Sequence, residues 1–247
     1  IDKTINDGAI EDGAAISIVN RTGYKGLSKI EVEGGKFTAK GDNAAVKAYN
    51  WKELTPSDFT QNDKVSVSGG TFSSDPTKYV VEDSAINKND DGTFGVAKAY
   101  LAKVGDTSYY TMDEAFKAQT ASGEAIVMLR DYTTGSTFNS GTIARTVDLA
   151  GHTWTCTGTD ANSAAFEINN PNATLTVKNG KVVSSQLVGL IPSAMGGTIK
   201  YDNSSLVFDG VVMTTTARSG IETNGNNTND TVTLRNSTLN VPNGFGI

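Results

Sequence analysis

The sequence contains few of the residues that most often carry chemistry. Its 247 residues include one cysteine, one histidine and five prolines, and aromatic residues make up 8%. A single cysteine cannot form a disulfide within the chain, and a single histidine cannot build a multi-histidine zinc site. No stretch approaches the roughly 18 consecutive apolar residues of a membrane-spanning helix, so we expect no membrane insertion.

The chain also lacks an excess of positive charge. It has 21 Lys and Arg against 27 Asp and Glu, a net charge of −6 that is spread along the sequence. We therefore expect no binding to nucleic acid. Gly, Ser, Thr and Asn make up about two fifths of the residues and are poor helix formers. Because 37% of the residues are hydrophobic, the chain is not expected to be disordered, and an all-β protein rich in turns remains.

An eight-residue pattern recurs six times, at intervals of about 30 residues. It reads apolar, any, apolar, any, Gly or Asn, any, any, apolar, and the copies begin at Ile30, Val65, Val147, Leu175, Leu206 and Val232. Alternation of apolar and polar residues predicts strands with one buried face. Gly or Asn at the fifth position permits the left-handed backbone conformation that a corner requires.

A shorter pattern, small-small-apolar, precedes three of these copies and begins at Ala44, Ala164 and Ser219. Two or three short strands per repeat, joined at Gly or Asn corners, predict a right-handed parallel β-helix (a β-solenoid). A tandem of immunoglobulin-like sandwiches is the main alternative. Sandwich strands, however, need not repeat a corner residue at a fixed place.

The middle of the chain interrupts the repeats. Thr111 and Glu114 match a capping box and predict one short helix over residues 112–119, with Gly123 after it. A helix at this place would cover the open end of a solenoid. We therefore expect residues 1–95 to end one β-helical unit and residues 96–247 to be the capped start of a second. Because residues 244–247 look like the opening of another repeat, we expect the second unit to be truncated.

Several stretches resemble modules of large cell-surface proteins of gut Gram-positive bacteria. Residues 65–80 and 89–94 are similar to the module end, and residues 102–116, 126–129 and 149–153 to the module start. The resemblance covers roughly residues 28–182 and implies a β-helix of the pectin-lyase-like kind. It also implies an extracellular location, cell-wall associated or secreted, and a role in surface display or adhesion. It transfers no active-site residues.

Pectin-lyase-like folds include lyases and hydrolases, so catalytic groups were sought at outward positions of adjacent repeats. The repeats predict a ladder of Lys178, Asp209 and Arg235 there, which we interpret as charge pairing on a solvated face. Ala150 occupies the matching place in the preceding copy, so no second carboxylate is expected to join them. We therefore expect no catalytic residues.

Three other features are interpreted as structural. His152 lies at a corner beside Asp148, and Cys156 alternates with a tryptophan and should point inward. Residues 87–93 superficially match the first half of a calcium loop, but Lys98 stands where a bidentate glutamate is required. A tight Asp-Gly turn explains the same residues, so we expect neither a metal nor a cofactor.

Glycan binding is the most specific function that the residues suggest. Tyr49, Trp51, Tyr109 and Tyr110 fall at or near loops, where exposed rings could stack on sugars. Alternation within its strand should turn Tyr49 outward.

We therefore expect a non-enzymatic, extracellular β-helical segment of a modular bacterial surface protein. Its expected partners are host or dietary glycans, or another surface protein. One alternative is a polysaccharide-active enzyme, either a pectate-lyase-like lyase or a glycoside hydrolase. Another is a filament subunit that associates end to end through open sheet edges.

Overall fold

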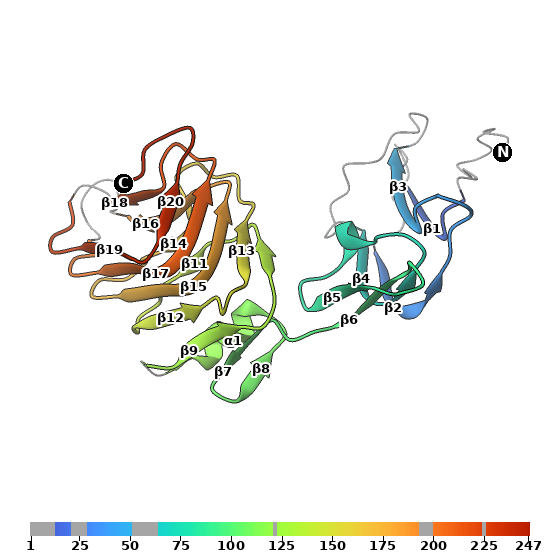
Figure 1. Cartoon of the computed structure of the whole chain (residues 1–247), viewed down its shortest axis with the longest axis horizontal. Helices are drawn as coiled ribbons and strands as arrows, with labels where there is room; N and C mark the ends of the chain where they lie inside the picture. The colour runs from blue at the N-terminus through green and yellow to red at the C-terminus, as the bar shows by residue number, and fades with distance from the viewer. Residues whose placement is uncertain (1–12, 21–28, 51–63, 121–122, 193–199, 224–225) are drawn as a thin grey trace. The chain divides into compact units, whose positions relative to one another are not determined.

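The computed structural model describes residues 13–20, 29–50, 64–120, 123–192, 200–223 and 226–247 (Figure 1). The chain divides into two compact units, residues 1–99 and residues 100–247. Strands dominate both, and the described residues contain one α-helix and one short 3-10 helix, Thr77–Tyr79. The expected all-β class with a single α-helix is confirmed. That the two units are β-helical modules stays a prediction.

The first unit combines parallel and antiparallel pairs. β1 (Ile16–Asn20) pairs with β3 (Val46–Asn50), and β2 (Ile30–Phe37) pairs with β4 (Val65–Phe72), both in parallel. β4 then pairs in antiparallel fashion with β6 (Phe94–Lys98), which also pairs with β5 (Ser84–Lys88). The bounds of β2 and β4 are those of the first two eight-residue repeats. Their apolar positions, among them Val32, Val67 and Phe72, lie in a buried cluster.

The Asp-Gly segment of the first unit forms the turn of the β5–β6 hairpin. The amide of Asn89 donates to the carbonyl of Thr93 at 2.8 Å, and Gly92 takes a φ of +82°. The Asp91 carboxylate accepts from the amide and the hydroxyl of Thr93, at 2.9 and 2.6 Å. These contacts confirm the predicted turn.

The second unit contains two sheets between which the chain alternates (Figure 1). The larger sheet comprises β7 (Ala102–Val104), β8 (Thr107–Tyr109), β9 (Ala125–Met128), β10 (Tyr132–Thr134), β12 (Arg145–Asp148), β13 (Thr153–Cys156), β15 (Thr174–Ser184), β17 (Ser205–Thr215), β19 (Thr231–Arg235) and β20 (Thr238–Asn240). The smaller sheet comprises β11 (Phe138–Asn139), β14 (Ala164–Glu167), β16 (Leu187–Ile191) and β18 (Ile221–Thr223). Every pair from β9 onward in these sheets is parallel, apart from the pairing of β9 with β7.

Equivalent residues of successive strands stack into columns, and the apolar columns form the core between the two sheets. One column is Val147, Val177, Phe208 and Leu234, and another is Trp154, Val182, Met213 and Leu239. The first three members of each column are at most 1% exposed. Cys156 is also 1% exposed, which confirms its predicted inward position. Alternation along each strand therefore supplies the core without any long apolar run.

The predicted corners are present, with one shift. Gly151, Asn179, Gly210 and Asn236 all have positive φ, between +50° and +88°. In the two repeats of the first unit, the left-handed residue is one position later than predicted, at Gly35 and Gly70. The pairing of β2 with β4 contains register shifts in this part of the strands.

A second corner carries a stack of asparagines. Asn172, Asn203 and Asn229 have φ values of +58°, +58° and +60°. The side-chain amide of Asn203 donates to Asn172 Oδ1 at 3.3 Å, and that of Asn229 donates to Asn203 Oδ1 at 3.0 Å. Asparagine tolerates the left-handed conformation, and its amide can bond the layers above and below. The three residues therefore both turn the chain and tie neighbouring layers together.

The helix α1 (Met112–Ala118) begins as predicted and ends before Gly123. Glu114 N donates to Thr111 Oγ1 at 3.2 Å, and Thr111 N donates to Glu114 Oε2 at 3.1 Å, which confirms the capping box. Met112 and Ala115 are buried in the core of the second unit. The helix therefore covers core residues near β7 and β8 with its apolar face.

Arg145, the first residue of β12, fastens the end of this helix. Its Nη1 donates to the carbonyls of Phe116 and Gln119 at 3.0 and 3.3 Å, and to Gln119 Oε1 at 3.0 Å. Its guanidinium carbon lies 3.6 Å from the centre of the Phe116 ring. The side chain is nearly buried, and burial lowers its pKa. A cation at a helix C-terminus satisfies carbonyls that have no partner within the helix.

We predict that Arg145→Ala detaches α1 from the core. The substitution leaves the Phe116 and Gln119 carbonyls without their donor, which should lower the free energy of unfolding by about 1–3 kcal/mol. Hydrogen exchange of the α1 amides should accelerate more than exchange in β15. Lys117→Ala is the matched control, because it removes only the exposed ion pair with Asp113 on the same helix. Equal effects of the two substitutions would contradict the assigned role of Arg145.

Candidate functional site

The structure describes the side chains of only two of the four aromatic residues selected from the sequence. Trp51 lies outside the described residues. Tyr49 is the fourth residue of β3, with its backbone paired to Val19, but its side chain is outside the described part. Tyr109 and Tyr110 both belong to the second unit. Only these two can be assessed as members of a binding surface.

Tyr109 and Tyr110 are consecutive but take different roles. Tyr109 ends β8 and packs against the buried cluster of the second unit, so its ring contributes to packing. Tyr110 stacks on Tyr100, with ring centres 4.5 Å apart and an angle of 21° between the rings. Tyr100 is 48% exposed, the largest exposure of any tyrosine on the described surface. The stacked pair Tyr100–Tyr110 is therefore an exposed aromatic surface.

Tyr100 was not among the aromatic residues selected from the sequence. Its position in the sequence could have indicated it, because Tyr100 lies just before β7, and Tyr109 and Tyr110 lie at the far end of the same hairpin. In β7 and β8, Ala102 pairs with Tyr109, and the Leu101 amide donates to the Tyr109 carbonyl at 2.8 Å. Continuing this register sets Leu101 opposite Tyr110, and the ring of Tyr100, one residue earlier, stacks on the ring of Tyr110.

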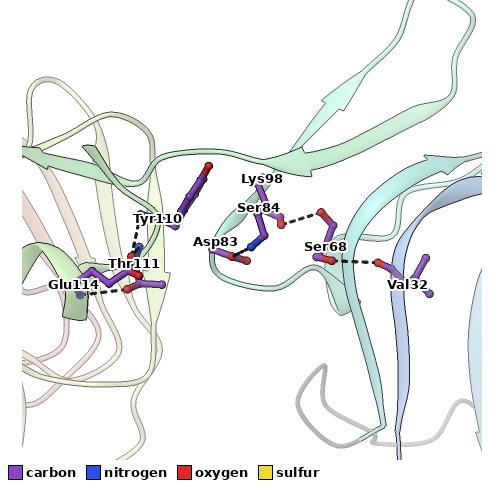
Figure 2. A network of polar contacts seen from close by, with 8 residues as sticks. All are labelled: Val32, Ser68, Asp83, Ser84, Lys98, Tyr110, Thr111 and Glu114. Carbon is purple, nitrogen blue, oxygen red and sulfur yellow. Dashed lines mark hydrogen bonds and ion pairs between the residues drawn. The ribbon is translucent and has the colours of Figure 1, made fainter. Parts of the chain in front are cut away.

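The capping box of α1 also holds the backbone of Tyr110. Glu114 Oε2 accepts from the amides of both Tyr110 and Thr111, each at 3.1 Å (Figure 2). One carboxylate therefore fixes the start of the helix and the residue that carries the stacked ring. An aromatic pair that is positioned before a ligand arrives loses less conformational entropy on binding. A tyrosine ring offers an apolar face together with a hydroxyl that both donates and accepts.

The outer face of the larger sheet carries a ladder of alternating charges. Asp148 pairs with Lys178, Lys178 with Asp209, and Asp209 with Arg235. Lys178 Nζ lies 3.4 Å from Asp148 Oδ2, and Arg235 Nε lies 3.9 Å from Asp209 Oδ2. The predicted three-residue ladder is confirmed. The expectation that no second carboxylate joins it is wrong.

The extra carboxylate enters because the corner after β12 is longer than the repeat implies. Val147 pairs with Val177, whereas the repeat aligns it with Leu175, so Asp148 takes the place predicted for Ala150. The side-chain amide of Asn179 also donates to Asp148, at 3.2 and 3.3 Å to its two oxygens. Asn236 donates to Asp209 in the same manner at 3.4 Å. Each aspartate is therefore occupied by the cation and the asparagine of the next layer.

A second polar face lies on the outside of the smaller sheet. Glu167, Leu190 and Glu222 stack on successive strands. Arg218 holds Glu222 in a two-pronged contact, with Nε and Nη2 each 3.0 Å from a carboxylate oxygen, and its Nη1 donates to Asn162 at 3.2 Å. Leu190, the middle residue of this column, also belongs to a small buried cluster with Ala164 and Leu187.

The two glutamates of this face differ in ionisation. Burial raises the pKa of Glu167, and the nearby charge of Asp160 raises it further. Hydrogen bonding from Arg218 lowers the pKa of Glu222, against a smaller opposing effect of burial. The pKa values of the two carboxyls are thus shifted in opposite directions, as they are between the acid and the base of many hydrolases.

His152 and Cys156 each contact a polar side chain of the second unit. His152 Nδ1 lies 3.4 Å from Asp131 Oδ1, and the same oxygen accepts from the Thr153 amide at 2.8 Å. The Cys156 thiol donates to Gln186 Oε1 at 3.2 Å inside the core. Among the described residues, no group of three or more His, Cys, Asp and Glu is placed to hold a metal ion. No described helix is long and apolar enough to cross a membrane.

Comparison with known proteins identifies no relative of this chain: no family model, no curated protein and no solved structure matches it.

We predict opposite pH-dependent effects for the two glutamates of the smaller sheet. The raised pKa of Glu167 means that its ionised form costs stability above the unfolded pKa, near 4.3. Glu167→Gln should therefore raise the melting temperature at pH 7, and the gain should disappear as pH falls below about 4. Glu222 contributes stability above the unfolded pKa and loses it as pH falls through its lowered pKa. Glu222→Gln should therefore lower the melting temperature at pH 7.

Thermal unfolding between about pH 3 and pH 8 measures both effects. Glu124→Gln, at an exposed position of the same unit, is the control and should change little at any pH. A Glu167→Gln protein that is less stable than wild type at pH 7 would disprove the assigned burial effect.

Proposed function

We propose that this chain is a β-helical segment of an extracellular bacterial surface protein, which displays an adhesive region and binds glycans. The observation that supports the β-helix is the alternation of the chain between two sheets, with each return adding a parallel strand beside the previous one. The corners in left-handed conformation recur at equivalent places in successive layers. Crossovers between parallel strands are almost always right-handed, which favours the right-handed form.

A display role agrees with the way polar groups are used on the larger sheet. The charged ladder pairs each aspartate with a cation of the next layer, and the asparagine stack bonds its own neighbours. These groups are engaged in holding layers together, which suits a rigid spacer. The single cysteine, Cys156, is free and buried. The fold therefore needs no disulfide, and the display role does not depend on whether the surroundings are oxidising.

Glycan binding is assigned to the Tyr100–Tyr110 pair. Its support is the exposure of Tyr100, the parallel stacking of the two rings and the anchoring of the Tyr110 backbone by Glu114. A flat ring that is exposed on one side can cover the apolar face of a sugar while its hydroxyl bonds to a sugar hydroxyl.

A polysaccharide hydrolase is the second candidate, and Glu167 and Glu222 favour it. They stand two strands apart, which separates their Cα atoms by roughly 9–10 Å. Inverting glycosidases place a protonated and an ionised carboxyl about 6.5–9.5 Å apart. Against this reading, Arg218 occupies Glu222 with two hydrogen bonds, so the base is not free to activate water. Release of reducing sugar by wild type, abolished in Glu167→Gln, would establish the hydrolase.

We predict that a glycan array will detect binding that depends on Tyr100. Tyr100→Ala should weaken it about 5- to 10-fold, as expected when an aromatic contact of about 1 kcal/mol is lost. Tyr110→Ala should have a similar effect, because it removes the ring on which Tyr100 stacks. Titration calorimetry with the best glycan on the array measures both changes.

Two conservative variants control this experiment. Tyr100→Phe keeps the ring and should retain most of the affinity. Tyr109→Phe alters a packing residue of the same hairpin and should bind as wild type does. Absence of binding to every glycan would refute glycan recognition and leave only the display role.

A further inference from the structure

We propose that the first unit carries a separate glycan site, a polar groove on the outer face of β2 and β4 that accepts a short oligosaccharide with free amino groups. This inference rests on the glycan-binding role proposed above and extends it to a second site and a ligand class. The groove has a volume of about 320 Å³, within the range of small-ligand sites.

The strands place polar side chains on both sides of the groove. Val32 and Val67 point into the core, so their neighbours Glu31, Glu33, Ser66 and Ser68 point outward. Glu31 and Ser66 are directly opposite each other in the parallel pair. The two serines therefore line the floor, and the glutamates of β2 line one wall.

The opposite wall is formed by the segment that precedes β5. The Val81 amide donates to the Val67 carbonyl at 3.0 Å, so this segment runs along the other side of β4 and adds Asp83 to the groove. Ser84 Oγ donates to the Ser68 carbonyl at 3.2 Å (Figure 2). Because Ser84 is 4% exposed, this hydrogen bond is protected and holds the wall to the floor. The groove therefore exists before a ligand binds.

Two of the three carboxylates in the described lining of the groove, Glu31 and Asp83, form ion pairs with lysines. Lys29 lies 2.5 Å from Glu31, and Lys98 lies 3.3 Å from Asp83 (Figure 2 shows the second pair). Glu33 is exposed and has no ion-pair partner among the residues that the structure describes. The described lining holds three carboxylates, Glu31, Glu33 and Asp83, and two lysines, Lys29 and Lys64. An ammonium group in the groove would pair with Glu33.

The groove favours a sugar over a peptide. The backbone groups of β2 and β4 are already paired with each other, so an extended peptide lying on this face would leave its own amides without partners. Sugar hydroxyls both donate and accept, and they can bond to Ser66, Ser68 and the carboxylates at once. None of the described residues that line the groove is aromatic, so we expect hydrogen bonds and charge to carry the binding there. Its affinity should therefore fall as salt rises.

Two tetrasaccharides of the same backbone test the proposal: β-1,4-linked glucosamine and its N-acetylated form. Titration calorimetry and amide chemical shifts of the whole chain should show that the amino form binds through residues of β2 and β4. Raising the salt from about 50 mM to about 500 mM should weaken binding severalfold. Glu33→Gln should weaken binding of the amino form about tenfold and remove the preference over the acetylated form.

Two variants separate this site from the tyrosine pair. Asp42→Asn changes an exposed carboxylate outside the groove and should leave binding as in wild type. Tyr100→Ala should leave the binding of the amino tetramer unchanged. Equal binding of the two tetramers, or an unaltered affinity in Glu33→Gln, would overturn the groove, while a Tyr100-dependent glycan would still uphold the proposed function. Failure of every glycan to bind would overturn both.

Discussion

The second unit depends on one constraint, which is that each strand must pair in parallel register with the strand one layer away. This pairing stacks equivalent side chains in columns, so a slip of one residue would turn every core residue outward. The columns of Val147 and Trp154 show the result, because their buried members come from strands far apart in sequence. Polar columns enforce the same register from outside. The asparagine stack and the charged ladder both join residues that meet only when the layers are aligned.

Much of this arrangement could be predicted because the repeats are local and periodic. Alternation identified the buried positions, and the Gly or Asn at the fifth place identified four corners within the second unit. The repeat that contains β12 and β13 was aligned two residues out of register with β15, because its corner contains extra residues. The alternation of apolar residues within each strand does not reveal such an insertion. Asp148 was therefore missed on the ladder. β16 was missed for the opposite reason, since Leu187–Ile191 is buried throughout and shows no alternation.

The candidate sites were harder to predict than the fold. Tyr110 was selected for its place near a loop, but its stacking partner Tyr100 becomes its neighbour only through hairpin pairing. Tyr109 met the same sequence criterion, and its partly buried ring packs against the core. The groove of the first unit depends on a segment that returns beside β4, so Asp83 joins residues about 50 positions earlier in the chain. The role of Arg145 was equally hard to predict. An arginine in an apolar column is explained only by its hydrogen bond to the Phe116 carbonyl near the end of α1, which the sequence does not show.

The alternation of the charged ladder restricts how such a protein can change length during evolution. Layers that contact only their neighbours can be duplicated or deleted without redesigning the rest. Here, removing the layer of Lys178 would bring Asp148 beside Asp209, and duplicating it would bring two lysines together. Like charges directly opposite each other in a sheet are destabilising. Duplicating or deleting two layers together would keep the charges alternating, so it should cost less stability than adding or removing one layer.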